Sequence, residues 1–273
     1  IKFLCEIAEP DYGIITNVGK AHLEGFGSFE GVIKTKGELY DFLRKKDAIT
    51  FIHHDNPYLM NISQGLNLIS YGTEDDLYVN GRITGNSPYL AFEWKAGKDG
   101  ELHQVCTQLI GEYNFPNALA AITIGRFFGV EAKKIDEALA EYTPQNNRSQ
   151  LKKTEDNTLI IDAYNANPTS MMAALQNFRN MTVPHKMLIL GDMRELGADS
   201  PAEHQKIVGY IKESDFEKVW LVGEQFAASE HTFKTYADVQ EVIKDLQEDK
   251  PKGYTILIKG SNGIKLSSTV EFL

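Results

Sequence analysis

Continuous apolar runs recur at a regular spacing in the second half of the chain, and helical patterns separate them. The runs are TLIIDAY (158–164), KMLILGD (186–192), KVWLVGE (218–224) and YTILIKGS (254–261), with helices expected to begin near Pro168, Ser200 and Asp238. Strands that are apolar on both faces are typical of a parallel sheet that helices cover on both sides. The alternation therefore predicts an α/β fold with a Rossmann-like, doubly wound domain.

The first half of the chain has a more mixed pattern. It predicts strands over 12–18 and 48–53, and helices over 28–43, 57–64, 116–129 and 130–142. Between residues 66 and 110, short alternating segments broken by NG, GNSP and GKDG predict antiparallel hairpins. The polar segment YTPQNNR (142–148) contains a proline and marks a domain boundary. We therefore predict domains over residues 1–144 and 145–273.

Charge and hydropathy exclude two classes of partner. Lys plus Arg number 28 and Asp plus Glu number 38, so the net charge is −10, which argues against binding to nucleic acid or to an anionic membrane. No apolar run approaches the roughly 18–20 residues that span a bilayer. Cys5 and Cys106 lie far apart and outside any CxxC motif, which predicts reduced, buried thiols in a cytoplasmic protein.

Lys36 is the most informative single residue. It shares one face of the predicted 28–43 helix with Ile33 and Tyr40, so it interrupts an apolar stripe. A lysine in such a place must extend to the surface, find a partner or lose its charge. Desolvation lowers the pKa of a lysine and provides a neutral amine for chemistry. The residues alone leave both interpretations open, a surface-reaching lysine and a functional amine.

Other polar residues stand where predicted elements begin or end. His22 lies in a loop and could bind a metal, contact a phosphate or simply form a surface hydrogen bond. Asn114 and Asn117 open the 116–129 helix, as a helix cap or as ligands beside free backbone N–H groups. Asp162 ends an apolar strand, where it could accept ribose hydroxyls or only terminate the strand, and Arg148 follows the predicted boundary.

The segment GIITNVGKA (13–21) resembles a Walker A phosphate loop but does not match it. Five residues, rather than four, separate Gly13 from Gly19, and Ala21 stands where a Ser or Thr would bind magnesium. We therefore identify no phosphate loop in the chain.

Several segments, taken in order, resemble the Mur ligases. They are ITNVGKAHLEGFGSFEGVIKTKGELYDFL, YNFPNALAA, YTPQNNRSQ, IDAYNANPTSMMAAL, LGDMRELG and IKGSNG. The resemblance extends over nearly the whole chain. It implies that the first domain is the remainder of a mononucleotide-binding, ATPase-type central domain and that the second is the carboxyl-terminal domain of the family.

The resemblance also implies a reaction. Mur ligases are ATP-dependent acid–amino-acid ligases, in which a substrate carboxylate becomes an acyl phosphate that an amine then attacks. The motifs are most similar to members that join UDP-N-acetylmuramoyl-tripeptide to D-alanyl-D-alanine in peptidoglycan precursor synthesis, with ATP and Mg²⁺, and we expect a monomer. Two alternatives stay open: another amide ligase of the superfamily, including the folylpolyglutamate type, and a nucleotide-binding module without catalysis.

Residue roles follow from the resemblance alone. It implies that His22 and Lys36 bind Mg²⁺, with Lys36 as a carbamate, and that Arg148 reaches ATP. It further implies adenine contacts for Asn114 and Asn117, a ribose contact for Asp162, places in the same loop for Tyr164 and Asn165, and positions facing the incoming dipeptide for Asp192, Glu195 and His204.

Two departures from the family pattern matter. The phosphate loop, the magnesium-binding Glu and the domain that binds the UDP moiety do not occur in the sequence, so the chain resembles the carboxyl two-thirds of a family member. We therefore expect that it cannot complete catalysis alone. In addition, Asn262 stands where many relatives have Arg.

Overall fold

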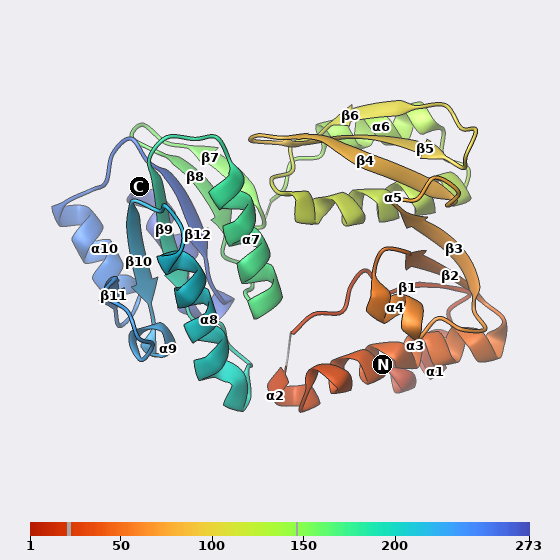
Figure 1. The fold of residues 1–273 in the computed structure, drawn as a ribbon, viewed down its shortest axis with the longest axis horizontal. Helices are drawn as coiled ribbons and strands as arrows, with labels where there is room; N and C mark the ends of the chain where they lie inside the picture. Colours follow the sequence, from red (N-terminus) through yellow and green to blue (C-terminus); the bar gives the residue numbers. More distant parts are fainter. Residues whose placement is uncertain (21–22, 146) are drawn as a thin grey trace. The chain divides into compact units, whose positions relative to one another are not determined.

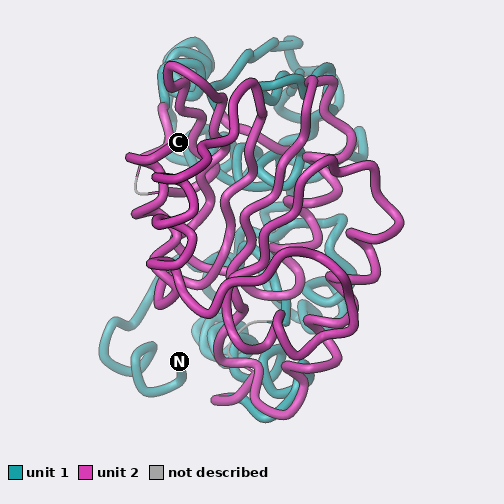
Figure 2. Tube along the Cα trace, turned by 90° about the vertical axis from the view of Figure 1, so that its left-hand side faces the viewer, with its two compact units in different colours: residues 1–20, 26–108, 112–142 teal, residues 21–25, 109–111, 143–273 magenta. Residues whose placement is uncertain are grey.

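The structure is a computed structural model that describes residues 1–20, 23–145 and 147–273. The chain forms two compact units, which Figure 2 shows in different colours. The first unit contains residues 1–20, 26–108 and 112–142. The second contains residues 143–273 and two short segments, 109–111 and one that ends at Gly25.

A six-stranded sheet forms the centre of the first unit within the described residues, in the order β1-β2-β3-β4-β5-β6 (Figure 1). Its strands are β1 (Tyr12–Ile14), β2 (Ile49–His53), β3 (Asn67–Gly72), β4 (Val79–Asn86), β5 (Leu90–Ala96) and β6 (His103–Cys106). The helices in this part of the chain are α1 (Lys2–Ala8), α2 (Leu23–Phe26), α3 (Phe29–Lys46), α4 (Pro57–Asn61), the 3₁₀ turn η1 (Glu112–Asn114), α5 (Phe115–Phe127) and α6 (Ala132–Glu141).

Parallel and antiparallel pairing meet in this sheet. Strands β1, β2 and β3 are parallel, and Ile49 lies opposite both Tyr12 and Asn67. Strand β3 also pairs in parallel with the start of β4, whereas β4, β5 and β6 are antiparallel. The prediction of hairpins over 66–110 is therefore correct for β4 to β6 and wrong for β3.

Local signals explain where the first-unit elements begin. Helix α3 follows Ser28, whose Oγ accepts a hydrogen bond from the Gly31 N–H at 3.1 Å, as the predicted N-cap requires. The NG pair at Asn80-Gly81 is not a turn but lies inside β4. A Cβ on Gly81 would lie 2.5 Å from the Glu93 carbonyl oxygen and 3.2 Å from Leu119 of α5. This glycine therefore allows close packing rather than a turn.

The second unit has its own six-stranded sheet within the described residues, in the order β11-β10-β9-β12-β8-β7. The strands are β7 (Gln150–Lys153), β8 (Thr158–Asp162), β9 (Lys186–Gly191), β10 (Lys218–Val222), β11 (Lys234–Tyr236) and β12 (Thr255–Lys259). The helices are α7 (Pro168–Asn180), α8 (Ser200–Lys212), α9 (Glu224–Ala227), α10 (Val239–Glu248) and the 3₁₀ turns η2 (Gly197–Asp199), η3 (Asn262–Ile264) and η4 (Leu266–Glu271).

Helices cover both faces of this sheet. On one face, alternate strand residues such as Leu159, Ile189 and Ile258 join a core with Val242 of α10 and Leu266 of η4. Successive strand residues point to opposite faces, and α7 and α8 lie on the other face, in front of the sheet in Figure 1. Strands β8 to β11 and β12 are parallel where they pair, so the doubly wound prediction is confirmed. The antiparallel edge strand β7 and the short strand β11 were not predicted.

Two composition-based expectations can also be compared with the structure. No helix among the described residues is long and apolar enough to cross a membrane. Cys5 is buried, as predicted, but Cys106 is exposed. The prediction is wrong for Cys106 because successive side chains of β6 point to opposite faces, and its neighbour Val105 takes the buried side.

Candidate functional site

Two oppositely charged residues end neighbouring parallel strands of the second unit. Asp162 ends β8 and Lys259 ends β12, and the strand register places them opposite each other. Lys259 is only 1% exposed, and its Nζ donates to Asp162 Oδ2 at 2.5 Å. A buried ammonium needs such a partner, because an unpaired charge in the interior costs several kcal/mol. The pair lies at the carboxyl edge of the sheet, where open α/β sheets bind ligands.

Arg148 and Tyr164 extend this charged pair toward the surface. The other Asp162 oxygen, Oδ1, accepts from the Ser149 N–H at 3.3 Å. Asn147 and Ser149 both have left-handed backbone conformations, with φ of 58° and 46°, so the chain turns sharply on both sides of Arg148. The Arg148 guanidinium carbon lies 4.0 Å from the centroid of the Tyr164 ring, and both side chains are exposed. The structure thus brings together three of the residues that the sequence indicated.

The loop after β8 is held by its own polar groups. Asn165 is exposed, and its Oδ1 accepts from the Ala166 N–H at 2.8 Å. Asn167 caps α7 in a reciprocal capping box with Ser170. These bonds fix the backbone beside Asp162, so the loop with Asn165 and Asn167 has a defined geometry.

Lys36 belongs to the first unit and is half-buried. Its Nζ donates to the backbone oxygen of Asn17 at 2.9 Å, in the segment after β1. Burial lowers the pKa of Lys36 from its ordinary value, because the ammonium is partly removed from water. The neighbouring Lys34 is exposed. Lys36 is therefore easier to deprotonate than a surface lysine, which favours the functional amine.

The metal and adenine roles of His22, Asn114 and Asn117 stay predictions. His22 lies outside the described residues, and the described residues contain no group of three or more His, Cys, Asp or Glu side chains that could hold a metal. Asn114 occupies the N-cap position of α5, but its side chain makes no capping hydrogen bond within the described part of the chain. Asn117, in the first turn of α5, is exposed. The role of Asn114 is thus not that of a side-chain cap.

Asp192 and His204 have structural partners inside the second unit. The two Asp192 carboxylate oxygens accept from the N–H groups of Gln225 and Phe226, each at 3.0 Å. His204 is fully buried, its Nε2 accepts from the Met193 N–H at 3.0 Å, and its Nδ1 donates to the Ser200 carbonyl at 2.8 Å. Burial lowers the pKa of His204, so the imidazole is neutral. The expectation that His204 faces a substrate is therefore wrong.

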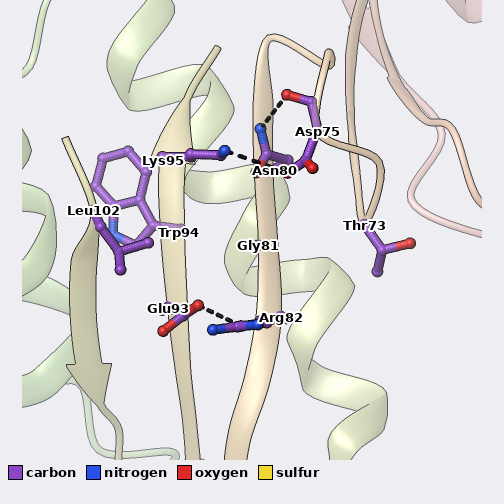
Figure 3. Close-up of a pocket in the computed structure, with 9 residues that line it drawn as sticks. All are labelled: Thr73, Asp75, Asn80, Gly81, Arg82, Glu93, Trp94, Lys95 and Leu102. Atoms are coloured by element: carbon purple, nitrogen blue, oxygen red, sulfur yellow. Dashed lines mark hydrogen bonds and ion pairs between the residues drawn. The ribbon is translucent and has the colours of Figure 1, made fainter. Parts of the chain in front are cut away.

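A pocket lies in each unit, and predicted residues line the one in the second unit. Asp192 and Glu195 help to line a pocket of about 760 Å³ at the carboxyl ends of β9 and β10. Another pocket, of about 250 Å³, lies on β4 and β5 (Figure 3). Its charges are paired with each other: Arg82 with Glu93, and Lys95 with Asp75 at 3.3 Å. None of the sequence-predicted site residues lines this second pocket.

Comparison with known families decides what kind of protein has this arrangement. The family model for the Mur ligase middle domain matches residues 2–125, and the model described as Mur ligase, glutamate ligase domain, matches residues 147–262. The chain belongs to the Mur ligase family. The main division between the units lies between residues 142 and 143, in the segment that neither family model matches.

Curated relatives of this Mur ligase are longer than the chain itself. The UDP-N-acetylmuramoyl-tripeptide–D-alanyl-D-alanine ligase of Bacillus subtilis (strain 168) is 32% identical over 285 residues, which cover 100% of this chain and 61% of that protein. The ligase of the same name from Escherichia coli (strain K12) is 29% identical and is covered over 62% of its length. The chain therefore spans less than two thirds of these relatives.

Solved structures share the fold of this Mur ligase chain. The MurF ligase from Thermotoga maritima in complex with ADP has a TM-score of 0.85 at 24% identity, over 100% of this chain and 63% of that one. A MurF structure from Acinetobacter baumannii has a TM-score of 0.84 at 24% identity, over 99% and 61%. At this identity the likeness concerns the fold alone.

Lys259 is the site residue that sequence reasoning missed. In the sequence, this lysine stands at the end of an apolar run, in the segment IKGSNG. Such a position is easily taken for that of a solvated loop residue. One signal was available: a lysine and an aspartate each end a fully apolar run of a predicted parallel sheet. Their pairing, however, depends on strand order, which the local pattern does not contain.

Proposed function

We propose that this chain carries the ATP-binding and carboxyl-terminal parts of a ligase that joins D-alanyl-D-alanine to UDP-N-acetylmuramoyl-tripeptide in peptidoglycan precursor synthesis. The observation that carries the proposal is the similarity to ligases of that name over the entire chain, at 32% identity for the Bacillus subtilis protein. The cluster around Asp162 supports the nucleotide part of the proposal, because it combines an ionised acceptor with an exposed cation at a ligand-binding edge.

ATP contacts are proposed for residues of each unit, taken separately. In the second unit, Asp162 accepts the ribose hydroxyls, and the exposed Arg148 guanidinium, stacked on Tyr164, contacts phosphate oxygens. Each Asp162 oxygen accepts only one hydrogen bond among the described residues, so a lone pair on each is left for a sugar hydroxyl. In the same unit, Asn165 lines the loop beside the ribose. In the first unit, Asn114 and Asn117 contact adenine.

Magnesium is assigned to His22 and Lys36 as part of this proposal. Mg²⁺ usually keeps several waters and takes only one or two protein ligands together with substrate phosphates, so a ready-made cluster of acids is not required. The lowered pKa of Lys36 supports the proposal, because a carbamate forms only on a neutral amine. When bound, the metal would neutralise phosphate charge during transfer.

The proposed reaction has two bond exchanges. A carboxylate oxygen of the tripeptide bonds to the γ-phosphorus of ATP as the bond to ADP breaks, which gives an acyl phosphate. The amine nitrogen of D-alanyl-D-alanine then attacks the acyl carbon, the C–O bond to phosphate breaks, and the amine gives up a proton. The residues of this chain bind and orient: Asp162 fixes the nucleoside, and Arg148 offsets the charge that the phosphates carry.

The test is ligation by the gene product that contains this chain. We would supply ATP, Mg²⁺, UDP-N-acetylmuramoyl-tripeptide and D-alanyl-D-alanine, and follow phosphate release together with the pentapeptide product. Parallel reactions would replace the dipeptide by D-alanine, L-lysine or L-glutamate. Product with D-alanyl-D-alanine alone is expected. Product with another amine would indicate a different amide ligase of the family, and ATP binding without any product would indicate a non-catalytic nucleotide-binding module.

A further inference from the structure

We propose that Lys259 is a positioning residue for the nucleotide, which orients the Asp162 carboxylate toward the two ribose hydroxyls. The inference rests on the proposed function, in which Asp162 binds the ribose. It assigns a role to a residue that touches no ligand itself and acts through its neighbour. The role depends on three features of Lys259: its burial, its register and its second contact.

The burial of Lys259 is unusual for a lysine. Its side chain is 2% exposed, compared with 15% for Asp162, so the ammonium lies beneath the carboxylate. It is the last residue of β12, directly opposite the last residue of β8. Because both strands belong to one parallel sheet, neither end can shift without breaking the ladder between them. The position of the ammonium is therefore set by the sheet and not by a flexible loop.

The carboxylate of Asp162 is held at both oxygens. Lys259 Nζ donates to Oδ2, and the Ser149 N–H donates to Oδ1. Two donors on different oxygens prevent rotation of the carboxylate plane. The free lone pairs then have a fixed direction. Such an acceptor can bind two adjacent hydroxyls at once, which is the chemistry of a ribose.

Lys259 also connects this acceptor with the loop after β8. Its Nζ lies 3.4 Å from the backbone oxygen of Asn165, the residue that follows Tyr164. One buried ammonium thus ties the acceptor to the loop whose aromatic ring supports Arg148. A side chain that served packing alone would need neither contact, since an apolar residue of similar volume fills the same space without a desolvation cost.

The test compares the affinity of the gene product for ATP with its affinity for 2′-deoxy-ATP. The wild type should bind ATP about tenfold more tightly, because a partly buried acceptor left without its hydroxyl partner is penalised. Lys259→Met should reduce this ratio to about one. Lys186→Met is the matched control: Lys186 starts β9 at the opposite edge of the same sheet, where its Nζ donates to the Arg179 backbone oxygen. This control should keep the tenfold ratio.

Two further variants keep the proposal testable if Lys259→Met does not fold. Lys259→Arg keeps the charge, and it should retain part of the preference for ATP. Asp162→Asn should lose the preference, and adding Lys259→Met to it, which removes both charges, should change neither dissociation constant by more than about twofold. Such non-additivity is the signature of one residue acting through the other.

The outcomes separate this inference from the proposed function. A wild type that prefers ATP, together with a folded Lys259→Met that keeps the same preference, would overturn the role of Lys259 alone. A further large loss when Lys259→Met is added to Asp162→Asn would also overturn it. A wild type that binds both nucleotides equally would remove Asp162 from the ribose, and a wild type that binds neither would refute the proposed function itself.

Discussion

Replacing Arg148 with alanine should separate nucleotide use from folding. In the structure Arg148 is exposed, and its described side-chain contact is the stacking on Tyr164, at 4.0 Å from the ring centroid. Cation–π contacts at exposed sites contribute about 0.5–1 kcal/mol. The free energy of unfolding of the second unit should therefore fall by no more than about 1 kcal/mol, which corresponds to a few degrees in Tm for a domain of this size.

The expected loss in catalysis is larger than the loss in stability. In the proposed site the guanidinium donates to phosphate oxygens, and hydrogen bonds to charged groups contribute about 1.5–3 kcal/mol. Removing that contact should lower kcat/KM for ATP by about 10- to 100-fold. The assay is steady-state phosphate release by the gene product at varied ATP, with UDP-N-acetylmuramoyl-tripeptide and D-alanyl-D-alanine both saturating. Thermal unfolding is measured on the same samples.

Arg179→Ala provides the matched control for Arg148→Ala. Arg179 is also exposed, and its guanidinium carbon lies 5.7 Å from the centroid of the Tyr210 ring in the same unit, away from Asp162. It should lose a similar small amount of stability with unchanged ATP kinetics. If Arg148→Ala leaves kcat/KM for ATP within twofold of the wild type, or if Arg179→Ala lowers it equally, Arg148 does not contact the nucleotide.

Three other perturbations test separate parts of the argument. Lys36→Met should lower ligation by more than about 100-fold but cost the first unit only about 1 kcal/mol, because Lys36 is half-buried and donates one hydrogen bond among the described residues, to the Asn17 backbone oxygen. Ligation assays and thermal unfolding measure the two effects, and an equal fall in both would show a general folding defect instead. Burial lowers the pKa of His204, so the unfolded chain takes up a proton that the folded unit does not. The unfolding free energy of the second unit should be complete above about pH 6.5 and fall by up to about 1.4 kcal/mol per pH unit below it. Urea unfolding followed by Trp220 fluorescence measures this slope, and a His204→Gln variant with an equally steep slope would contradict the assignment. Residues 1–273 expressed alone, without a phosphate loop in their sequence, should give no pentapeptide, and any product would show that nucleotide binding here does not need one.

Much of the second unit could be predicted because its signals are local. Strands buried on both faces appear as unbroken apolar runs, and β8, β9, β10 and β12 were all located in this way. Helix starts were located by capping residues, as at Asp238, whose Oδ1 accepts from the Gln240 and Glu241 N–H groups. Asp162 could be named as a candidate because it stands at the end of one such run.

The features that could not be predicted depend on pairing between distant segments. The alternation of β3 does not reveal that it runs parallel to β2, since parallel and antiparallel strands both alternate. The family resemblance implied that His204 faces the substrate, but its burial follows from the packing of α8 against α9 and against the segment after β9. Likewise, Lys259 and Asp162 are 97 residues apart, and only the strand order brings them together.

The pairing with Lys259 also favours one interpretation of Asp162. An aspartate that only terminates a strand can be satisfied by water, and it gains little from a lysine buried beneath it. Burying the ammonium carries a desolvation cost that Coulomb attraction offsets only when the geometry is good, and apolar replacements of such pairs are often neutral or stabilising. The pair lies at the carboxyl edge of the sheet, beneath the exposed Arg148 and Tyr164. Packing alone does not require its desolvation cost. A fixed acceptor for a ligand is a physical reason for the pair. The preference of Lys259→Met for ATP over 2′-deoxy-ATP is therefore a more decisive measurement than the stability of this variant.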